Sequence, residues 1–84
     1  MSTKHVDKNG WEHEVFDLRE NKDRGGFETG IEVVDKNGEW LAEIGIWTTE
    51  DKDLDDYDGV FELNMGTIEA LRKAGITVDE SFEP

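Results

Sequence analysis

Hydrophobic and polar side chains alternate along two stretches of the chain, residues 27–34 and 40–47. Residues 27, 29, 31 and 33 share one face of the first stretch, and residues 40, 42, 44 and 46 share one face of the second. A period of two predicts β-strands that bury one face. The segment between them is VDKNG, and its Asn37-Gly38 pair is a strong hairpin signal because both residues tolerate a positive φ. The pattern therefore predicts a β-hairpin.

The length of the hairpin loop sets which residues lie opposite each other. A two-residue loop, Asn37-Gly38, pairs Val33 with Ala42. A four-residue loop, Asp35 to Gly38, pairs Val33 with Trp40. Both registers keep the apolar faces of the two strands on the same side of the sheet, which a buried face requires.

Two arguments choose between the loops. A three-residue loop would set Ile31 opposite Glu43 and turn the apolar face of one strand into solvent, so we reject it. A two-residue loop would set Glu32 opposite Glu43, and like charges that face each other across a strand pair are destabilising. We therefore expect the four-residue loop.

VDKNG occurs a second time, at residues 6–10, and again a tryptophan follows. With Asp7 to Gly10 as the loop, Val6 faces Trp11 and the second strand continues to Leu18. The two copies differ by one residue, Glu39, before the tryptophan. We interpret VDKNG as a turn sequence used twice, and neither as an internal repeat nor as a ligand-binding motif.

One helix is predicted near the C-terminus. Asn64 is a favourable N-cap, and Met65, Ile68 and Leu71 share one face of the segment that follows. Gly75 supplies the left-handed residue that ends many helices.

Short strands are predicted on either side of the helix, at residues 60–63 and 76–78, with an acidic loop at residues 50–58. The fold class is therefore α+β, in one small domain covering residues 1–84. We expect a mainly antiparallel sheet of four to six strands, with hairpins turning at Asn9-Gly10 and Asn37-Gly38 and the C-terminal helix packed on one face.

Charge narrows the possible partners. The 84 residues contain 22 Asp and Glu against 9 Lys and Arg, a net charge of −13, and residues 50–58 are the densest acidic segment. Such a surface repels nucleic acid and anionic lipid and attracts a basic protein surface. The chain has no cysteine and no apolar run as long as a membrane span or signal-peptide core. We expect a cytoplasmic protein, with no direct nucleic-acid binding and no membrane contact.

Catalytic and metal-binding residues are sparse. His5 and His13 flank the first turn and could form half of a zinc site, to which Glu12 or Glu14 could add a carboxylate. Their spacing favours exposed strand histidines in solvent instead. No complete catalytic constellation is present, so we expect no enzymatic activity and no cofactor.

The acidic segment partly matches a calcium loop. Asp51, Asp53, Asp55 and Glu62 fall at positions one, three, five and twelve of an EF-hand loop. Position six is Asp56, where the loop needs a glycine, and no helix precedes the segment. Weak cation association is therefore favoured over a specific calcium site.

The same carboxylates can serve as a partner-binding surface. Carboxylates at alternate residues of an extended chain lie about 6.6 Å apart, a spacing suited to a groove that binds a phosphate backbone. Tyr57 and Trp47 can act as aromatic anchors beside them. The candidate partner-binding residues are Glu28, Glu32, Glu43, Trp47, Glu50, Asp51, Asp53, Asp55, Asp56, Tyr57 and Asp58.

In size and charge the chain is similar to small acidic inhibitors from phages and mobile elements that mimic nucleic acid, such as anti-restriction, anti-CRISPR and uracil-glycosylase inhibitor proteins. No family motif is matched, so the resemblance assigns no residue roles. It implies a DNA mimic that occupies the basic groove of a host nucleic-acid-processing or defence protein. We expect a monomer or a homodimer, because an unpaired sheet edge could pair with a second copy. Two alternatives stay open: a housekeeping domain of a halophile, acidic for solvation alone, and a weak calcium-binding module through Asp51–Glu62.

Overall fold

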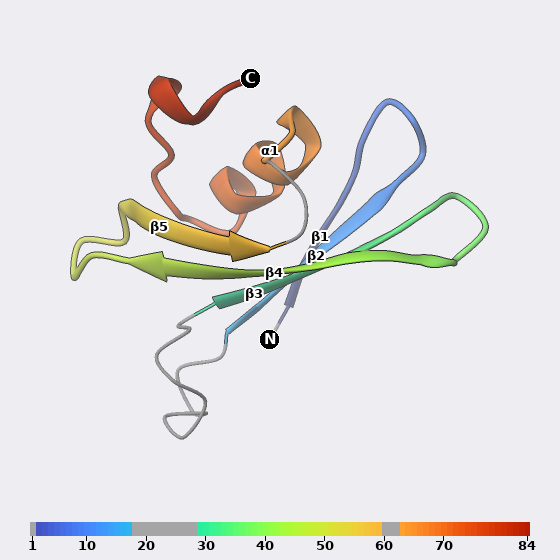
Figure 1. Ribbon diagram of the computed structural model, residues 1–84, viewed down its shortest axis with the longest axis horizontal. Helices are drawn as coiled ribbons and strands as arrows, with labels where there is room; N and C mark the ends of the chain where they lie inside the picture. Colours follow the sequence, from blue (N-terminus) through green and yellow to red (C-terminus); the bar gives the residue numbers. More distant parts are fainter. Residues whose placement is uncertain (1, 18–28, 60–62) are drawn as a thin grey trace.

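The structure is a five-stranded antiparallel sheet with one helix across it. The computed structural model describes residues 2–17, 29–59 and 63–84. Its elements are β1 (Ser2–Val6), β2 (Glu12–Asp17), β3 (Thr29–Val34), β4 (Trp40–Thr48), β5 (Leu54–Gly59), α1 (Met65–Lys73) and a short 3₁₀ turn, η2 (Glu80–Phe82). Each strand pairs with the next one along the chain, in the order β1-β2-β3-β4-β5. This arrangement confirms the predicted α+β class (Figure 1).

The hydrophobic core lies between α1 and the face of the sheet that the helix covers, which we call the inner face. Ile31, Ile44 and Ile46 of the sheet meet Ile68 and Leu71 of the helix, and all five side chains are buried. Burial of an aliphatic side chain of this size contributes about 1.5–3 kcal/mol. The period-two pattern of β3 and β4 and the helical period of α1 therefore supply the two halves of one core.

Both predicted ends of α1 are confirmed. The Asn64 side chain accepts a hydrogen bond from the backbone N–H of Thr67 at 2.9 Å, which satisfies one of the free donors of the first turn. At the other end Gly75 has φ of +92°, and the N–H of Ile76 donates to the carbonyl of Leu71. A left-handed glycine followed by this backward bond is a common helix stop.

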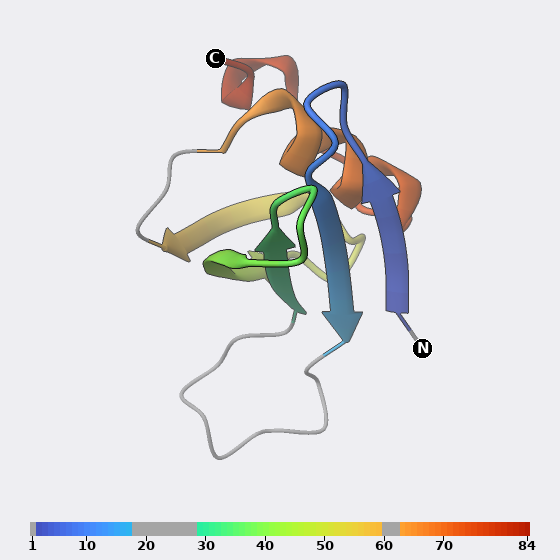
Figure 2. The same ribbon diagram turned by 90° about the vertical axis from the view of Figure 1, so that its right-hand side faces the viewer.

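The two VDKNG copies form the same turn. The Asp7 carboxylate accepts hydrogen bonds from the backbone N–H groups of Asn9 and Trp11, and Asp35 does the same for Asn37 and Glu39. Gly10 and Gly38 have φ of +81° and +82°, which a side chain would strain. The turns lie next to each other at one end of the sheet (Figures 1 and 2), where a Cβ on Gly10 would be 3.2 Å from the Cβ of Lys36.

The loop length expected for the second hairpin is wrong. The N–H of Asp35 donates to the carbonyl of Glu39 at 2.8 Å, so the loop is the three-residue one, Lys36 to Gly38. A β-bulge then shifts the register between Val33 and Val34. A bulge inserts one extra residue on one strand and so corrects the side-chain alternation.

Beyond the bulge the hairpin has the register that we assigned to a two-residue loop. Val33 lies opposite Ala42 and Ile31 opposite Ile44, and not opposite Trp40 and Ala42. Glu32 and Glu43 consequently face each other. The argument from like charges fails because alignment of the two apolar faces outweighs the repulsion between two solvated carboxylates.

The first hairpin departs from expectation by one residue. The N–H of Asp7 donates to the carbonyl of Trp11, so Val6 faces Glu12 and not Trp11. No extra residue follows this turn, and the register of β1 and β2 has no shift.

The acidic segment is a strand over most of its length, and not the loop we expected. Residues 54–59 form β5, which pairs with β4. Residues 60–62 of the predicted strand at 60–63 lie outside the described residues, and Leu63 is buried without strand structure. The predicted strand at 76–78 is reduced to a single parallel bridge between Asp53 and Thr77.

Candidate binding surface

One face of the sheet points away from the helix, and we call it the open face. Because side chains alternate along a strand, the residues between the core positions project from this face. In β2 and β3 these are Glu12, Glu14, Glu32 and Val34, which alternate with the buried His13, Val15, Ile31 and Val33. The open face is therefore rich in carboxylates.

Three glutamates form a row across the open face. Glu14 of β2 lies opposite Glu32 of β3, and Glu32 lies opposite Glu43 of β4. We call these three residues the glutamate row. Lys4 of β1 ends it, opposite Glu14, and its Nζ lies 3.8 Å from Glu14 and 3.7 Å from Glu12. Ion pairs this exposed contribute little, at most about 1 kcal/mol.

Two predicted aspartates extend the acidic surface beyond this row, and a predicted tryptophan lies beside them. Asp58 lies opposite Gly45 and Asp56 lies opposite Trp47, so all four residues project from the open face at β4 and β5. Asp56 also accepts a hydrogen bond from the N–H of Tyr57 at 2.8 Å. Glu32, Glu43, Trp47, Asp56 and Asp58 thus share one face.

The other predicted partner-binding residues lie elsewhere. Tyr57 is opposite Ile46 on the inner face and contacts Phe82 edge-on, with ring centroids 6.5 Å apart. Glu50 and Asp51 are exposed in the turn between β4 and β5, and Asp53 and Asp55 are exposed at the start of β5. Glu28 lies outside the described residues. The predicted set therefore does not form one continuous surface.

Glu12 and Glu14 belong to the open face and not to a zinc site with the histidines. The sequence signal for this position is alternation: Glu12 and Glu14 are two residues apart, as Glu32 and Val34 are, and residues two apart in a strand share one face. The histidines are on the opposite side of β1 and β2, so neither glutamate can join them.

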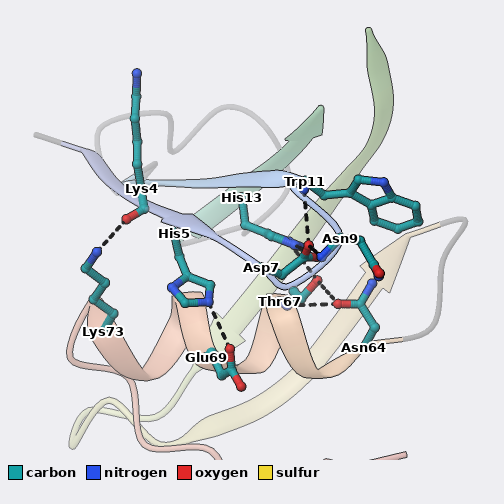
Figure 3. A network of polar contacts seen from close by, with 10 residues as sticks. All are labelled: Lys4, His5, Asp7, Asn9, Trp11, His13, Asn64, Thr67, Glu69 and Lys73. Atoms are coloured by element: carbon teal, nitrogen blue, oxygen red, sulfur yellow. Dashed lines mark hydrogen bonds and ion pairs between the residues drawn. The ribbon is translucent and has the colours of Figure 1, made fainter. Parts of the chain in front are cut away.

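The interpretation of the histidines as exposed is wrong for His13, and His5 is partly buried. His13 is 0% exposed and lies opposite His5, with the two rings 6.4 Å apart. His13 Nε2 lies 2.8 Å from Asp7 Oδ2, and because a carboxylate only accepts, Nε2 donates. On the other side of the ring, Nδ1 lies 3.2 Å from the hydroxyl of Thr67 in α1. Figure 3 shows His13 between the first turn and the helix.

These contacts join the β1–β2 hairpin to α1. The Thr67 hydroxyl also donates to Asn64 Oδ1, the N-cap oxygen, at 3.2 Å. Nearer the other end of the helix, His5 Nε2 lies 2.9 Å from Glu69 Oε2, and Lys73 Nζ donates to the carbonyl of Lys4 at 2.8 Å. We call the linked residues Asp7, His13, Asn64 and Thr67 the polar joint.

The polar joint has the residue types of a nucleophile, base and acid, but not their accessibility. Thr67 and His13 are both 0% exposed. The backbone N–H of Thr67 is bonded to Asn64 and cannot stabilise an oxyanion. Its chemistry is therefore structural: it satisfies buried polar groups and fixes the helix on the hairpin.

Hydrogen bonds hold the Asp7 carboxyl in its ionised form. Burial acts to raise the pKa of Asp7, but hydrogen bonds from His13, Trp11 and Asn9, together with the charge of His13, lower this pKa below its ordinary value. The stability that Asp7 contributes is therefore complete above the ordinary pKa of about 3.9 and is lost as pH falls through the lower pKa of the folded state.

This sign gives a pH prediction for D7N. At neutral pH, D7N should have a smaller free energy of unfolding than the native chain, because asparagine lacks the charge that faces His13. The difference should narrow as pH falls below about 4, since the native carboxyl then becomes protonated too. Urea denaturation of both proteins across this pH range measures the gap. A gap that stays constant would mean that the ionisation of Asp7 does not stabilise the fold.

No described residues form a metal site. Residues 2–17, 29–59 and 63–84 contain no group of three or more histidines, aspartates and glutamates placed to hold an ion. The calcium-loop hypothesis requires residues 51–62 to curl around one ion. Within this segment, residues 54–59 form an extended strand that pairs with β4, with a register shift between Trp47 and Thr48. Glu62 lies outside the described residues.

Comparison of the chain with protein-family models, curated proteins and solved structures finds no match. Within the described ranges, the chain has no helix with the length and apolar character needed to cross a membrane.

Proposed function

We propose that the chain is a non-enzymatic binding protein whose open face occupies the basic groove of a nucleic-acid-processing or defence protein in place of nucleic acid. In this proposal it acts in the cytoplasm of a bacterial host, as a phage or mobile-element inhibitor of the anti-CRISPR or anti-restriction type. The observation that carries the proposal is the glutamate row, in which Glu14, Glu32 and Glu43 face each other on adjacent strands.

The row presents negative charge at regular intervals, as a nucleic-acid strand does. Neighbouring strands lie about 4.8 Å apart, so the backbone positions of the three glutamates recur at this interval. Phosphates of one nucleic-acid strand recur about every 3.4 Å along the helix axis while winding around it. A groove whose Lys and Arg side chains bind a row of phosphates can place one of these cations against each carboxylate.

The cost of the row in the free protein also favours a partner. Like charges directly opposite each other on neighbouring strands destabilise a sheet. Only one lysine, Lys4, projects from the open face among the described residues, and it lies at the end of the row beyond Glu14. Departures from local stability rules concentrate at functional sites, and a basic partner would convert this repulsion into attraction.

The first test is affinity capture. The immobilised protein is exposed to a bacterial lysate, and bound proteins are eluted with a salt gradient and identified by mass spectrometry. Recovery of one nucleic-acid-binding protein, displaced by competing DNA or RNA, supports the proposal and identifies the target. A diffuse set of basic proteins that leaves at low salt would indicate that the acidity serves solvation alone.

The captured protein then allows a prediction at residue level. The double variant E32Q/E43Q should bind it roughly one to two orders of magnitude more weakly at low salt, with a flatter salt dependence, because electrostatic steering is lost. Titration at several salt concentrations measures both effects. The control E39Q/E80Q removes the same charge at exposed positions outside the glutamate row. Equal losses in the two variants would mean that net charge, and not the open face, sets the affinity.

A further inference from the structure

Three apolar side chains and one glutamate form a second row on the open face, next to the glutamate row. Val6 lies opposite Glu12, Glu12 opposite Val34, and Val34 opposite Trp40. Val6 is 59% exposed and Trp40 is 60% exposed. We call Val6, Val34 and Trp40 the apolar stripe. The second row crosses β2 at Glu12, two residues before Glu14, and β3 at Val34, two residues after Glu32, so it lies about 6.6 Å from the glutamate row.

The position of Trp40 depends on one extra residue and a bulge. After the first turn, Trp11 follows Gly10 directly and packs against the hydrophobic core. After the second turn, Glu39 intervenes, and Trp40 lies opposite Val34 on the open face. The bulge then returns Ala42, Ile44 and Ile46 to the core. Bulges commonly redirect a side chain in this way, and here the redirected side chain is a tryptophan, the residue type most enriched in binding hot spots.

We propose that the apolar stripe and the glutamate row together bind an amphipathic basic helix of the partner, one of the helices that contacts nucleic acid. This inference rests on the proposed function. It adds that the partner presents a helix with a narrow apolar side flanked by Lys and Arg. The apolar side packs on Val6, Val34 and Trp40, and the flanking cations reach Glu14, Glu32 and Glu43.

The dimensions agree with a helix laid across the strands. The apolar stripe runs from β1 to β4, three strand spacings or about 14 Å. A helix rises about 1.5 Å per residue, so about ten residues span the stripe. An amphipathic helix carries apolar residues along one side with polar residues beside them, as the two parallel rows require.

Charge excludes a second copy of this chain as the occupant. A second copy carries the same net charge of −13 and would set its own carboxylates against the glutamate row. A basic helix instead meets both rows with complementary groups. It also covers the face of the sheet that α1 leaves open, which gives the sheet a helix on each side.

The test uses a synthetic helical peptide of leucine and lysine, with leucines at i, i+3, i+4 and i+7 and lysines at the other positions. A peptide of the same composition in shuffled order serves as the second probe. Binding is measured by calorimetry over a range of salt concentrations, with the native chain, W40S, E32Q/E43Q and M65S. Met65 is also an exposed apolar residue, but it lies on α1.

The native chain should bind the amphipathic peptide more tightly than the shuffled one. W40S should weaken binding of the amphipathic peptide about tenfold or more at every salt concentration, without changing the slope against salt. E32Q/E43Q should flatten that slope, and M65S should leave binding unchanged. Circular dichroism of W40S checks that the fold is intact.

The outcomes separate this inference from the proposed function. If W40S binds like the native chain, or if both peptides bind equally, the helix docking is wrong. The proposed function still holds in that case if E32Q/E43Q weakens binding. If E32Q/E43Q has no effect on either peptide, the electrostatic function itself fails, and the docking fails with it. A dimer in sedimentation that W40S dissociates would assign the stripe to a second copy and overturn the inference.

Discussion

Replacement of His13 by alanine should reduce the free energy of unfolding by about 3–5 kcal/mol, the largest effect we expect from one substitution. The His13 ring is 0% exposed and bonds Asp7 on one side and Thr67 on the other. Its removal leaves the Asp7 carboxylate without its buried partner and opens a cavity beside α1. A domain of this size has a total stability of about 4–13 kcal/mol, so H13A approaches the limit of folding.

Urea denaturation measured by circular dichroism tests this expectation. H5A is the matched control, because His5 lies opposite His13 and also pairs with an acid of the hairpin–helix contact, Glu69. The His5 side chain is 24% exposed and that of Glu69 is 49% exposed. Loss of such a pair should cost less than about 1 kcal/mol. Similar losses in H5A and H13A would contradict a central role for the polar joint.

G66A should destabilise the protein by about 1–3 kcal/mol, although alanine is the better helix former. Gly66 lies in the first turn of α1, where its buried Cα faces the polar joint. A Cβ at this position would lie 2.6 Å from His13 Nε2, 2.7 Å from Asp7 Oδ2 and 2.9 Å from Asp7 Cβ. The two polar atoms are bonded to each other at 2.8 Å, so neither moves away without breaking that bond. The gain in helix propensity of about 1 kcal/mol is too small to compensate.

Thermal denaturation of G66A and of the double variant G66A/H13A separates the clash from the propensity. If the clash with His13 and Asp7 carries the cost, the loss caused by G66A should be smaller when His13 is already alanine. Stabilisation by G66A in the native background would mean that the helix and the hairpin are less closely packed than the distances around Gly66 indicate.

The positions of the turns and of the helix ends could be predicted from a few residues at each of them. Gly10, Gly38 and Gly75 adopt a positive φ and Asn64 caps the helix, so a turn or a helix end occurs at each predicted position, although the hairpin loops differ from those predicted. The register of the second hairpin could not be derived in the same way. Its loop and its strands favour alignments that differ by one residue, and a bulge, which has no signature in the sequence, reconciles them.

The candidate surface was only partly predictable. The acidity of residues 50–58 suggested a solvated loop, yet Leu54 and Tyr57 supply enough apolar contact with the core for a strand to form there. Strand alternation could place Glu32 and Glu43 on one face, and the structure adds that Glu14 lies in line with them. The burial of His13 depends on Asp7 and Thr67, which are distant from each other in the sequence, and spacing alone cannot reveal such a partnership.

The order of the strands has a consequence for how the chain acquires its structure. Each strand pairs with its predecessor, so the sheet can grow hairpin by hairpin as the polypeptide leaves the ribosome. The helix that covers it follows all five strands in the sequence and docks on the first hairpin, where Lys73 meets the backbone of Lys4. These contacts close a loop of nearly the whole sequence, and loop closure over such a distance is slow compared with hairpin formation. The apolar side of the sheet therefore stays exposed after the strands have paired, until α1 docks on it.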